Sequence, residues 1–255
     1  MKVLELFCGT KSFTKVAEAR GHECRTLDNN PQFEPTYCMD IMDFEPAILG
    51  DWKPDVIWAS PPCQCFSVMV ISKNWEEKRV GKLPSPKRLE AKLAMGVVLK
   101  TKDIIIQLKP TYWFIENPRG TLRKMAFMQG WLRSTVTYCQ YGLKYQKATD
   151  IWNNCYEWKP RPVCSPRSPC HARAPRGSRY GVQGVRADGK RVNSIHPLVM
   201  GEAKGQQSAD KYYRWQTVHE RDVRLETGWG AATIRAVVPP QLCEEIITAC
   251  EKAIA

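Results

Sequence analysis

The first 120 residues alternate between short apolar runs and longer stretches in which apolar residues recur at helical spacing. Short strand-like runs stand at 2–7, 23–27, 55–59 and 112–116; the run 2–7 alternates and is β-rich, and 55–59 is apolar after its first residue. Helical spacing is found between them, at 13–20 and at 89–108. In the second of these stretches the buried side is expected to consist of Leu93, Val97, Ile104 and Leu108. Apolar strands separated by helices predict a parallel sheet covered on both faces, and therefore an α/β fold.

The pattern changes after residue 120. Residues 135–138 and 151–152 are expected to form strands joined through Tyr141 and Gly142, which is a hairpin rather than a βαβ pattern. Residues 156–228 are rich in Pro, Gly, Arg and Ser and have little periodicity, so a small irregular second domain is expected there. Residues 1–155 would form the main domain. Within 229–255, a helix opened by Pro239 and Pro240 would pack back on that domain.

Composition supports a folded, basic chain. Its 255 residues are 43% hydrophobic, include nine tryptophans and carry a net charge of +12. No apolar run approaches the roughly 18 residues that a membrane span needs, and no secretory signal is expected. Eleven cysteines without such a signal favour reduced thiols, metal ligands or a nucleophile over a disulfide framework. An intracellular, cytoplasmic location follows.

Two segments hold almost all of the net charge. Residues 160–195 carry eight Arg and Lys side chains against the single acid Asp188, and residues 73–92 carry seven against three acids. Positive charge concentrated in segments punctuated by Gly and Pro predicts a phosphate backbone as partner. A solvated loop surface is the alternative for both segments.

A glycine-containing loop follows the first strand, and an acidic residue ends the second. Gly9 and Asp28 are 19 residues apart, which suits a Rossmann-like sheet that holds an adenosine ribose at its carboxyl edge. Residues 7–12 lack the full dinucleotide glycine pattern, so a nucleoside ligand without a pyrophosphate is expected. Asp40 could accept from an adenine amino group, although an isolated aspartate is also a common turn residue.

Two further strand ends carry reactive side chains. Ser60-Pro61-Pro62-Cys63-Gln64 directly follows the strand 55–59, so Cys63 is placed as a nucleophile at the sheet edge. Its alternative role is that of a buried packing residue. Glu116 stands at the end of the strand 112–116, and a parallel sheet would bring it near Cys63, where it could act as an acid or hydrogen-bond donor. The alternative for Glu116 is a helix or turn cap.

The order of these motifs resembles the DNA (cytosine-5)-methyltransferases, in particular a compact member of phage or solitary type. The resemblance covers residues 1–152 and 233–255 and is carried by LELFCGT, TLDNNP, SPPCQ, FIENP, YCQYGL and VVPP. It implies a Rossmann-like S-adenosylmethionine-dependent methyltransferase sheet. It also implies that double-stranded DNA is the substrate and that the chain acts as a monomer in a bacterial or phage-infected cell, with restriction-modification as one role.

The same resemblance implies a reaction. Cys63 would attack C6 of a cytosine flipped out of the duplex, while Glu116 engages N3 and the exocyclic amine. The C5 atom would then take the methyl group from S-adenosylmethionine, and loss of the C5 proton and of Cys63 would release the product. The loop 64–92 would close over the base.

Binding residues are implied as well. The cofactor would be held by residues of the strand-end motifs: Phe7, Gly9, Thr10, Asp28, Asn29, Asp40 and Pro61. DNA would be contacted by polar and basic residues of the two charged regions: Gln64, Ser67, Lys73, Arg173, Arg176 and Arg179.

Three places depart from the family pattern. The glycine-rich first loop is Thr10-Lys11-Ser12 here, and the terminal G-N-A-V-P-P is replaced by residues 235–240. The family's Q-x-R-x-R segment, which helps to fix the flipped base, is replaced by a segment with Lys144, Gln146, Lys147 and Asp150. Only lysines could take the arginines' part, and Lys147 is assigned to the catalytic set.

A structural zinc ion is a further possibility. Cys155, Cys164, Cys170 and His171 have the residue types of a zinc site, with His196 as a replacement ligand, although their spacing fits no standard pattern. Free thiols and a surface histidine are the alternative. Two other functions stay open: methylation of cytosine in tRNA, and DNA binding by a catalytically altered relative.

Overall fold

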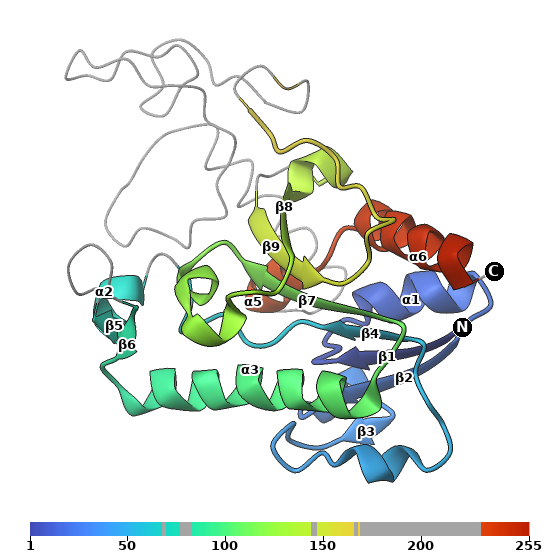
Figure 1. Cartoon of the computed structure of the whole chain (residues 1–255), viewed down its shortest axis with the longest axis horizontal. Coiled ribbons are helices and arrows are strands. Elements are labelled where there is room, and N and C mark those ends of the chain that lie inside the picture. The colour runs from blue at the N-terminus through green and yellow to red at the C-terminus, as the bar shows by residue number, and fades with distance from the viewer. Residues whose placement is uncertain (68–69, 77–82, 144–146, 166–167, 169–230, 255) are drawn as a thin grey trace. The chain divides into compact units, whose positions relative to one another are not determined.

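The computed structural model describes residues 1–67, 70–76, 83–143, 147–165, 168 and 231–254 (Figure 1). The chain divides into two compact units. The first comprises residues 1–136, 149–160 and 240–255, and the second comprises 137–148 and 161–239.

A seven-stranded sheet has the order β3-β2-β1-β4-β7-β9-β8. Its strands are β1 (Lys2–Leu6), β2 (Glu23–Asp28), β3 (Tyr37–Cys38), β4 (Val56–Ala59), β7 (Tyr112–Pro118), β8 (Arg133–Thr137) and β9 (Ala148–Asn153). The first five in the order pair in parallel, and β9 runs antiparallel to β7. The predicted α/β fold with a largely parallel sheet is confirmed.

Five α-helices and a small hairpin lie within the described residues. The helices are α1 (Ser12–Ala19), α2 (Ile71–Asn74), α3 (Leu89–Leu108), α5 (Ala231–Ala236) and α6 (Pro240–Ile254), and the hairpin pairs β5 (Trp75–Glu76) with β6 (Ser85–Pro86). Within the described ranges, no helix is both long and apolar enough to cross a membrane.

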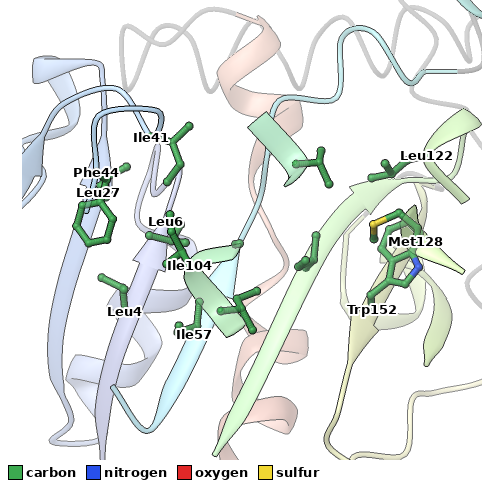
Figure 2. Packing of buried hydrophobic residues seen from close by; sticks show 14 of the residues in the cluster. Leu4, Leu6, Leu27, Ile41, Phe44, Ile57, Ile104, Leu122, Met128 and Trp152 are labelled. Atoms are coloured by element: carbon green, nitrogen blue, oxygen red, sulfur yellow. The ribbon is translucent and has the colours of Figure 1, made fainter. Parts of the chain in front are cut away.

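Alternating side chains of the central strands fill two cores. Leu4, Leu6 and Ile57 point to the face covered by α3 and pack with Ile104 of that helix, as Figure 2 shows. On the other face, Phe13 of α1 stacks on Trp58 with ring centroids 4.7 Å apart. Burial on both faces explains why these strands are apolar along their length.

The helix at 89–108 has the predicted bounds, but its predicted buried side is wrong in part. Leu93 is 62% exposed, whereas Ala91, Val98, Thr101, Ile104 and Ile105 are buried. A prediction that considers only large apolar residues therefore includes Leu93 in the buried face and misses the smaller buried residues.

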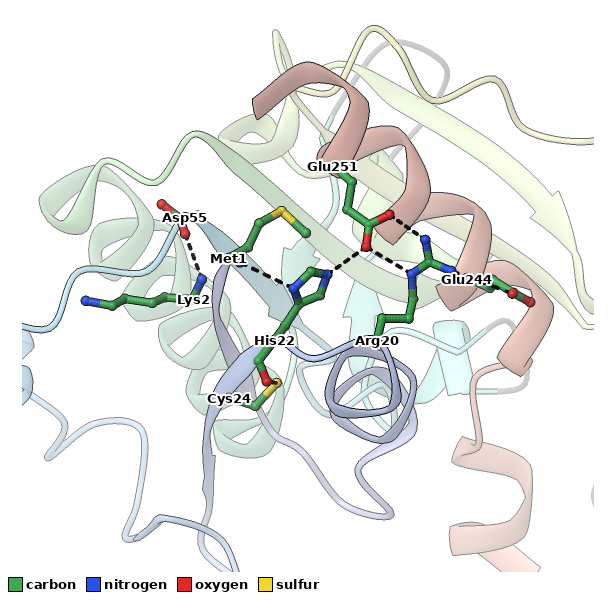
Figure 3. Close-up of polar contacts among 8 residues, drawn as sticks. All are labelled: Met1, Lys2, Arg20, His22, Cys24, Asp55, Glu244 and Glu251. Atoms are coloured by element: carbon green, nitrogen blue, oxygen red, sulfur yellow. Dashed lines mark hydrogen bonds and ion pairs between the residues drawn. The ribbon is translucent and has the colours of Figure 1, made fainter. Parts of the chain in front are cut away.

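Helix α6 is fastened to α1 and to the start of β2 by a polar cluster. Arg20 donates two hydrogen bonds to Glu251, one from Nε to Oε1 at 3.0 Å, and His22 Nε2 lies 2.8 Å from the same Oε1 (Figure 3). The hydrogen bond from Arg20 lowers the pKa of Glu251, which keeps the carboxylate charged. The apolar side of α6 predicted from the sequence is buried, with Leu242, Ile246, Ile247 and Cys250 at 1% exposure or less.

Candidate active site

The candidate residues gather because four parallel strands end at one edge of the sheet. β1 leads into the loop 7–11 and β4 leads into the segment Ser60–Cys63, while Asp28 is the last residue of β2. Glu116 lies within β7, which continues to Pro118, two residues beyond the predicted end of this strand. The carboxyl edge of an open parallel sheet is where such folds place their ligands.

Asp28 joins the first loop to the end of β2. Gly9 N donates to Asp28 Oδ2 and Asn30 N donates to Asp28 Oδ1, each at 2.9 Å. The predicted proximity of Gly9 and Asp28 is therefore present. The two amides fix the orientation of the carboxylate, whose remaining lone pairs can accept from a ribose hydroxyl.

Other members of the predicted cofactor set lie around this contact. Phe7 is half-buried in a left-handed backbone conformation, and Thr10 Oγ1 lies 3.1 Å from Ser12 Oγ. Asn29 is exposed. Asp40 is also exposed and accepts from Met42 N at 2.8 Å, which is the turn arrangement weighed as its alternative.

Lys11 takes the place where the family pattern has glycine. Its backbone is left-handed, with φ at 56°, and its Nζ donates to Glu34 O at 2.7 Å. The side chain therefore links the loop after β1 to the segment after β2. A lysine in this conformation pays a steric cost that glycine would not.

Glu5 is a buried carboxyl beneath the first turn of α1 that was not singled out from the sequence. Its two oxygens accept from Phe13 N at 3.3 Å and Thr14 N at 2.8 Å. Burial raises the pKa of Glu5 to about 7, even though both amides favour the charged form. The sequence signal for Glu5 was a single acid inside an otherwise apolar strand. Its hydrogen bonds to the first turn of α1 fix the position of this helix after the loop 7–11.

Cys63 lies half-buried in a loop that is held along its length. Before it, Ser60 N donates to Leu6 O at 3.2 Å. After it, Phe66 N and Ser67 N both donate to Cys63 O at 3.0 Å. Phe66 is fully buried and stacks on Trp75, so the loop has a fixed support.

Two other cysteines near this edge are held as thiols. Burial, with the charges of Glu5 and Asp28, raises the pKa of Cys8 to about 12. Burial and the charge of Glu90 raise the pKa of Cys65, whose Sγ donates to Glu90 O at 3.5 Å. Since a thiolate is the attacking species, neither is suited to nucleophilic attack at neutral pH.

Glu116 and Asn117 are buried residues near the carboxyl end of β7, next to the nucleophile loop. Glu116 is 5% exposed, and Asn117 is fully buried and donates from Nδ2 to Pro61 O at 3.0 Å. This bond ties the end of β7 to the residue two positions before Cys63. Behind the edge, the buried Cys243 of α6 has a raised pKa, caused mainly by burial and further by the charges of Glu5 and Glu116.

Lys147 belongs to the second unit. Its Nζ lies 4.6 Å from the centroid of the Tyr138 ring, and its carbonyl accepts from Tyr138 N at 3.2 Å. In the same unit Arg161, one of the basic residues of 160–195, donates from Nη1 to Gln140 O at 2.6 Å. Arg161 thus has a structural contact of its own within the unit.

The described residues include only some of the predicted DNA contacts. Gln64 and Lys73 are exposed, and Ser67 forms an isolated β-bridge with Gly120. Arg173, Arg176 and Arg179 lie outside the described residues.

The predicted zinc site is not supported. Among the described residues, no three His, Cys, Asp or Glu side chains are grouped so that they could hold a metal ion. Cys155 is buried with its Sγ 3.6 Å from Glu157 Oε2, and Cys164 N donates to Thr137 Oγ1 at 2.8 Å. Cys170, His171 and His196 lie outside the described residues. The spacing had already lacked the paired cysteines of standard zinc sites.

Comparison with known proteins places this arrangement among methyltransferases. The chain is 31% identical over 180 residues to a protein of Frog virus 3 (isolate Goorha) named probable DNA (cytosine-5)-methyltransferase, and the match covers 67% of this chain and 78% of that protein. No protein-family model matches the chain.

A solved structure shows a likeness of fold. The Entamoeba histolytica methyltransferase EhMeth aligns with 100% of this chain and 99% of its own, with a TM-score of 0.51 and 10% identity. A Spodoptera frugiperda DNMT2 mutant aligns with 66% of this chain at 20% identity and a TM-score of 0.38, and the chain spans 55% of that protein's length.

Proposed function

The chain belongs to the DNA (cytosine-5)-methyltransferase family, and we propose that it transfers a methyl group from S-adenosylmethionine to C5 of cytosine in double-stranded DNA, with Cys63 as nucleophile. The observation that carries the proposal is the meeting of two strand ends. Asn117 bonds to Pro61, so the buried carboxyl of Glu116 and the half-buried thiol of Cys63 are brought to one edge.

In this reaction the chain supplies a nucleophile and a partner for the base. The Cys63 thiolate adds to C6 of the cytosine, and the electron pair of the C5–C6 double bond moves toward C5. Glu116 is the hydrogen-bonding partner of N3 and the exocyclic amine, where charge develops as the thiolate adds. After methylation, a base removes the C5 proton, and the electrons of the C5–H bond re-form the double bond and expel the Cys63 thiolate. Lys147 is assigned to fixing the flipped base.

The cofactor site fits the nucleoside part of S-adenosylmethionine. Asp28 offers an oriented carboxylate to the ribose hydroxyls, and the loop 7–11 is bonded to it through Gly9. Phe7, Thr10, Asn29, Asp40 and Pro61 complete the proposed set. When bound, the cofactor supplies an electrophilic methyl group, and the chain's part is to hold it at the edge where Cys63 and Glu116 lie.

The basic charge favours a nucleic acid as the substrate, and the relative from Frog virus 3 favours DNA in particular. The two basic segments, 73–92 and 160–195, suit a duplex backbone, with Gln64, Ser67, Lys73, Arg173, Arg176 and Arg179 as proposed contacts. A base in a duplex must leave the stack to meet a cysteine at a sheet edge, so base flipping is part of the proposal. All proposed roles lie on one chain, which fits a monomer, and the cysteines of the described residues form no disulfide, which fits a reducing, cytoplasmic location.

The test is bisulfite-type sequencing of DNA and RNA from cells that express the chain or its Cys63→Ala variant. We expect cytosines that resist bisulfite conversion in the DNA, all in one sequence context. DNA from cells that express Cys63→Ala should contain none. Methylation confined to tRNA would show that tRNA, and not DNA, is the substrate. Unmethylated DNA and RNA, together with tight DNA binding, would favour the catalytically altered binding protein.

A further inference from the structure

Asp150 is a carboxylate with no exposed surface, close to the end of β7. Arg123 donates to it twice, from Nε to Oδ2 at 2.8 Å and from Nη2 to Oδ1, and Thr135 Oγ1 donates to Oδ1 at 2.8 Å. Arg133 Nε lies 4.0 Å from Oδ1. A buried carboxylate persists as an ion when it is paired and hydrogen-bonded in this way, and a bidentate guanidinium fixes geometry as well as charge.

Both partners are joined to the segment that carries Glu116. Asp150 stands directly opposite Asn117 in the antiparallel pairing of β9 with β7. Arg123 lies in the 3₁₀ turn Thr121–Lys124, which follows β7 and Gly120. The ion pair therefore fastens the chain on both sides of residues 118–120.

That segment also grips the nucleophile loop at two points. Asn117 Nδ2 donates to Pro61 O before Cys63, and Thr121 N donates to Phe66 O at 2.8 Å after it. Gly120 bridges to Ser67 and approaches so closely that a Cβ at this position would lie 2.1 Å from Phe66 O. Any displacement of 117–121 is thus passed to the residues flanking Cys63.

We propose that Arg123 and Asp150 form a positioning pair for the nucleophile loop, which sets where the Cys63 thiol lies relative to Glu116 without either side chain touching the substrate. The inference rests on the proposed function, because it assigns the pair a part in the attack of Cys63. Displacing a nucleophile by about 1 Å can cost about a hundredfold in rate.

The test is the rate of covalent adduct formation on DNA made with 5-fluorocytosine throughout, so that every sequence context carries the probe. Fluorine at C5 blocks the final elimination, and the Cys63–C6 bond then persists in a denaturing gel. The main variant is Arg123→Met combined with Asp150→Asn. It removes both charges together, so no unpaired charge is left buried. Arg123→Lys keeps the charge but loses the bidentate fork.

A matched control is the double variant Arg20→Met with Glu251→Gln. It removes another bidentate arginine–carboxylate pair of the first unit, between α1 and α6, that makes no contact with the nucleophile loop in the described residues. We expect the Arg123/Asp150 variant to form adduct at least tenfold more slowly at saturating DNA and S-adenosylmethionine. Its affinity for S-adenosylhomocysteine should stay within twofold of the unsubstituted protein. The rate of adduct formation by Arg123→Lys should lie between that of the Arg123/Asp150 variant and that of the unsubstituted protein. The rate of the control should stay within twofold of the unsubstituted protein.

A folded Arg123/Asp150 variant that forms adduct within twofold of the unsubstituted rate overturns the proposal. If that variant does not fold, the Arg123→Lys protein decides by the same criterion, provided that it binds S-adenosylhomocysteine normally. Failure of the proposed function looks different, because the unsubstituted protein itself would then form no Cys63-dependent adduct.

Discussion

Replacing Glu5 with glutamine should remove a pH dependence from the free energy of unfolding. The carboxyl lies in β1 at 2% exposure and accepts from the first amides of α1. Burial outweighs these hydrogen bonds and the charge of Lys11, and it raises the pKa of Glu5 from 4.5 to about 7.

The sign and size of the effect follow from proton linkage. Below about pH 4.5 the carboxyl is protonated in the folded and the unfolded state, and burial costs least. Between that pH and about 7 the unfolded chain releases a proton that the folded chain retains, so stability falls as the pH rises. Above pH 7 the full cost applies. It is about 3 kcal/mol, since a tenfold change in proton affinity corresponds to about 1.4 kcal/mol.

Urea unfolding of both proteins from pH 5 to pH 8.5 measures this directly. The unsubstituted protein should lose about 2–3 kcal/mol relative to Glu5→Gln across the range, because part of the cost already applies at pH 5 and contributions of other groups cancel in the comparison. Glu18→Gln, on an exposed position of α1, is the matched control for loss of one acid and should show no such difference. Parallel curves for the unsubstituted protein and Glu5→Gln would refute the reasoning.

Three further predictions concern the cofactor site, the nucleophile loop and the proposed DNA contacts. Asp28→Ala should weaken S-adenosylhomocysteine binding by about 1–3 kcal/mol, the cost of an unmade contact to the ribose, and equal affinities by calorimetry would contradict its placement. Gly120→Ala should abolish adduct formation or folding, because its Cβ would overlap the Phe66 carbonyl. A Gly120→Ala protein that melts and reacts normally would exclude the close approach. Alanine at phosphate-contacting arginines should lower the salt slope of DNA binding by about one each, tested at Arg173, Arg176 and Arg179. An unchanged slope for the triple variant would assign that segment to a solvated surface.

The sheet and the strand-end residues were predictable because their pattern is local. An apolar strand followed by a short motif places that motif at a known edge, and this was enough to bring Gly9 to Asp28 and the end of β7 to the loop of Cys63. No distant pairing had to be known, since parallel neighbours in a βαβ fold share their carboxyl edge.

Contacts between distant segments were not predictable in the same way. Arg123 and Asp150 are 27 residues apart, and they meet only because β9 pairs with β7 in one antiparallel register. In the sequence, Asp150 was noted only as part of the segment that replaces the family's Q-x-R-x-R pattern. Nothing in the sequence indicated that its side chain is buried. Lys147 was assigned to the base, but its contact with the Tyr138 ring depends on a turn whose shape the sequence does not specify.

The most direct test of the account identifies the atom that attacks DNA. The protein is incubated with S-adenosylmethionine and DNA containing 5-fluorocytosine, digested, and its DNA-linked peptides are sequenced by mass spectrometry, with Cys63→Ala treated in parallel. The account predicts one cross-linked site, Cys63, carrying a methylated 5-fluorocytosine nucleotide, and no cross-link in the variant. A cross-link at any other cysteine, or the same yield from Cys63→Ala, would contradict it.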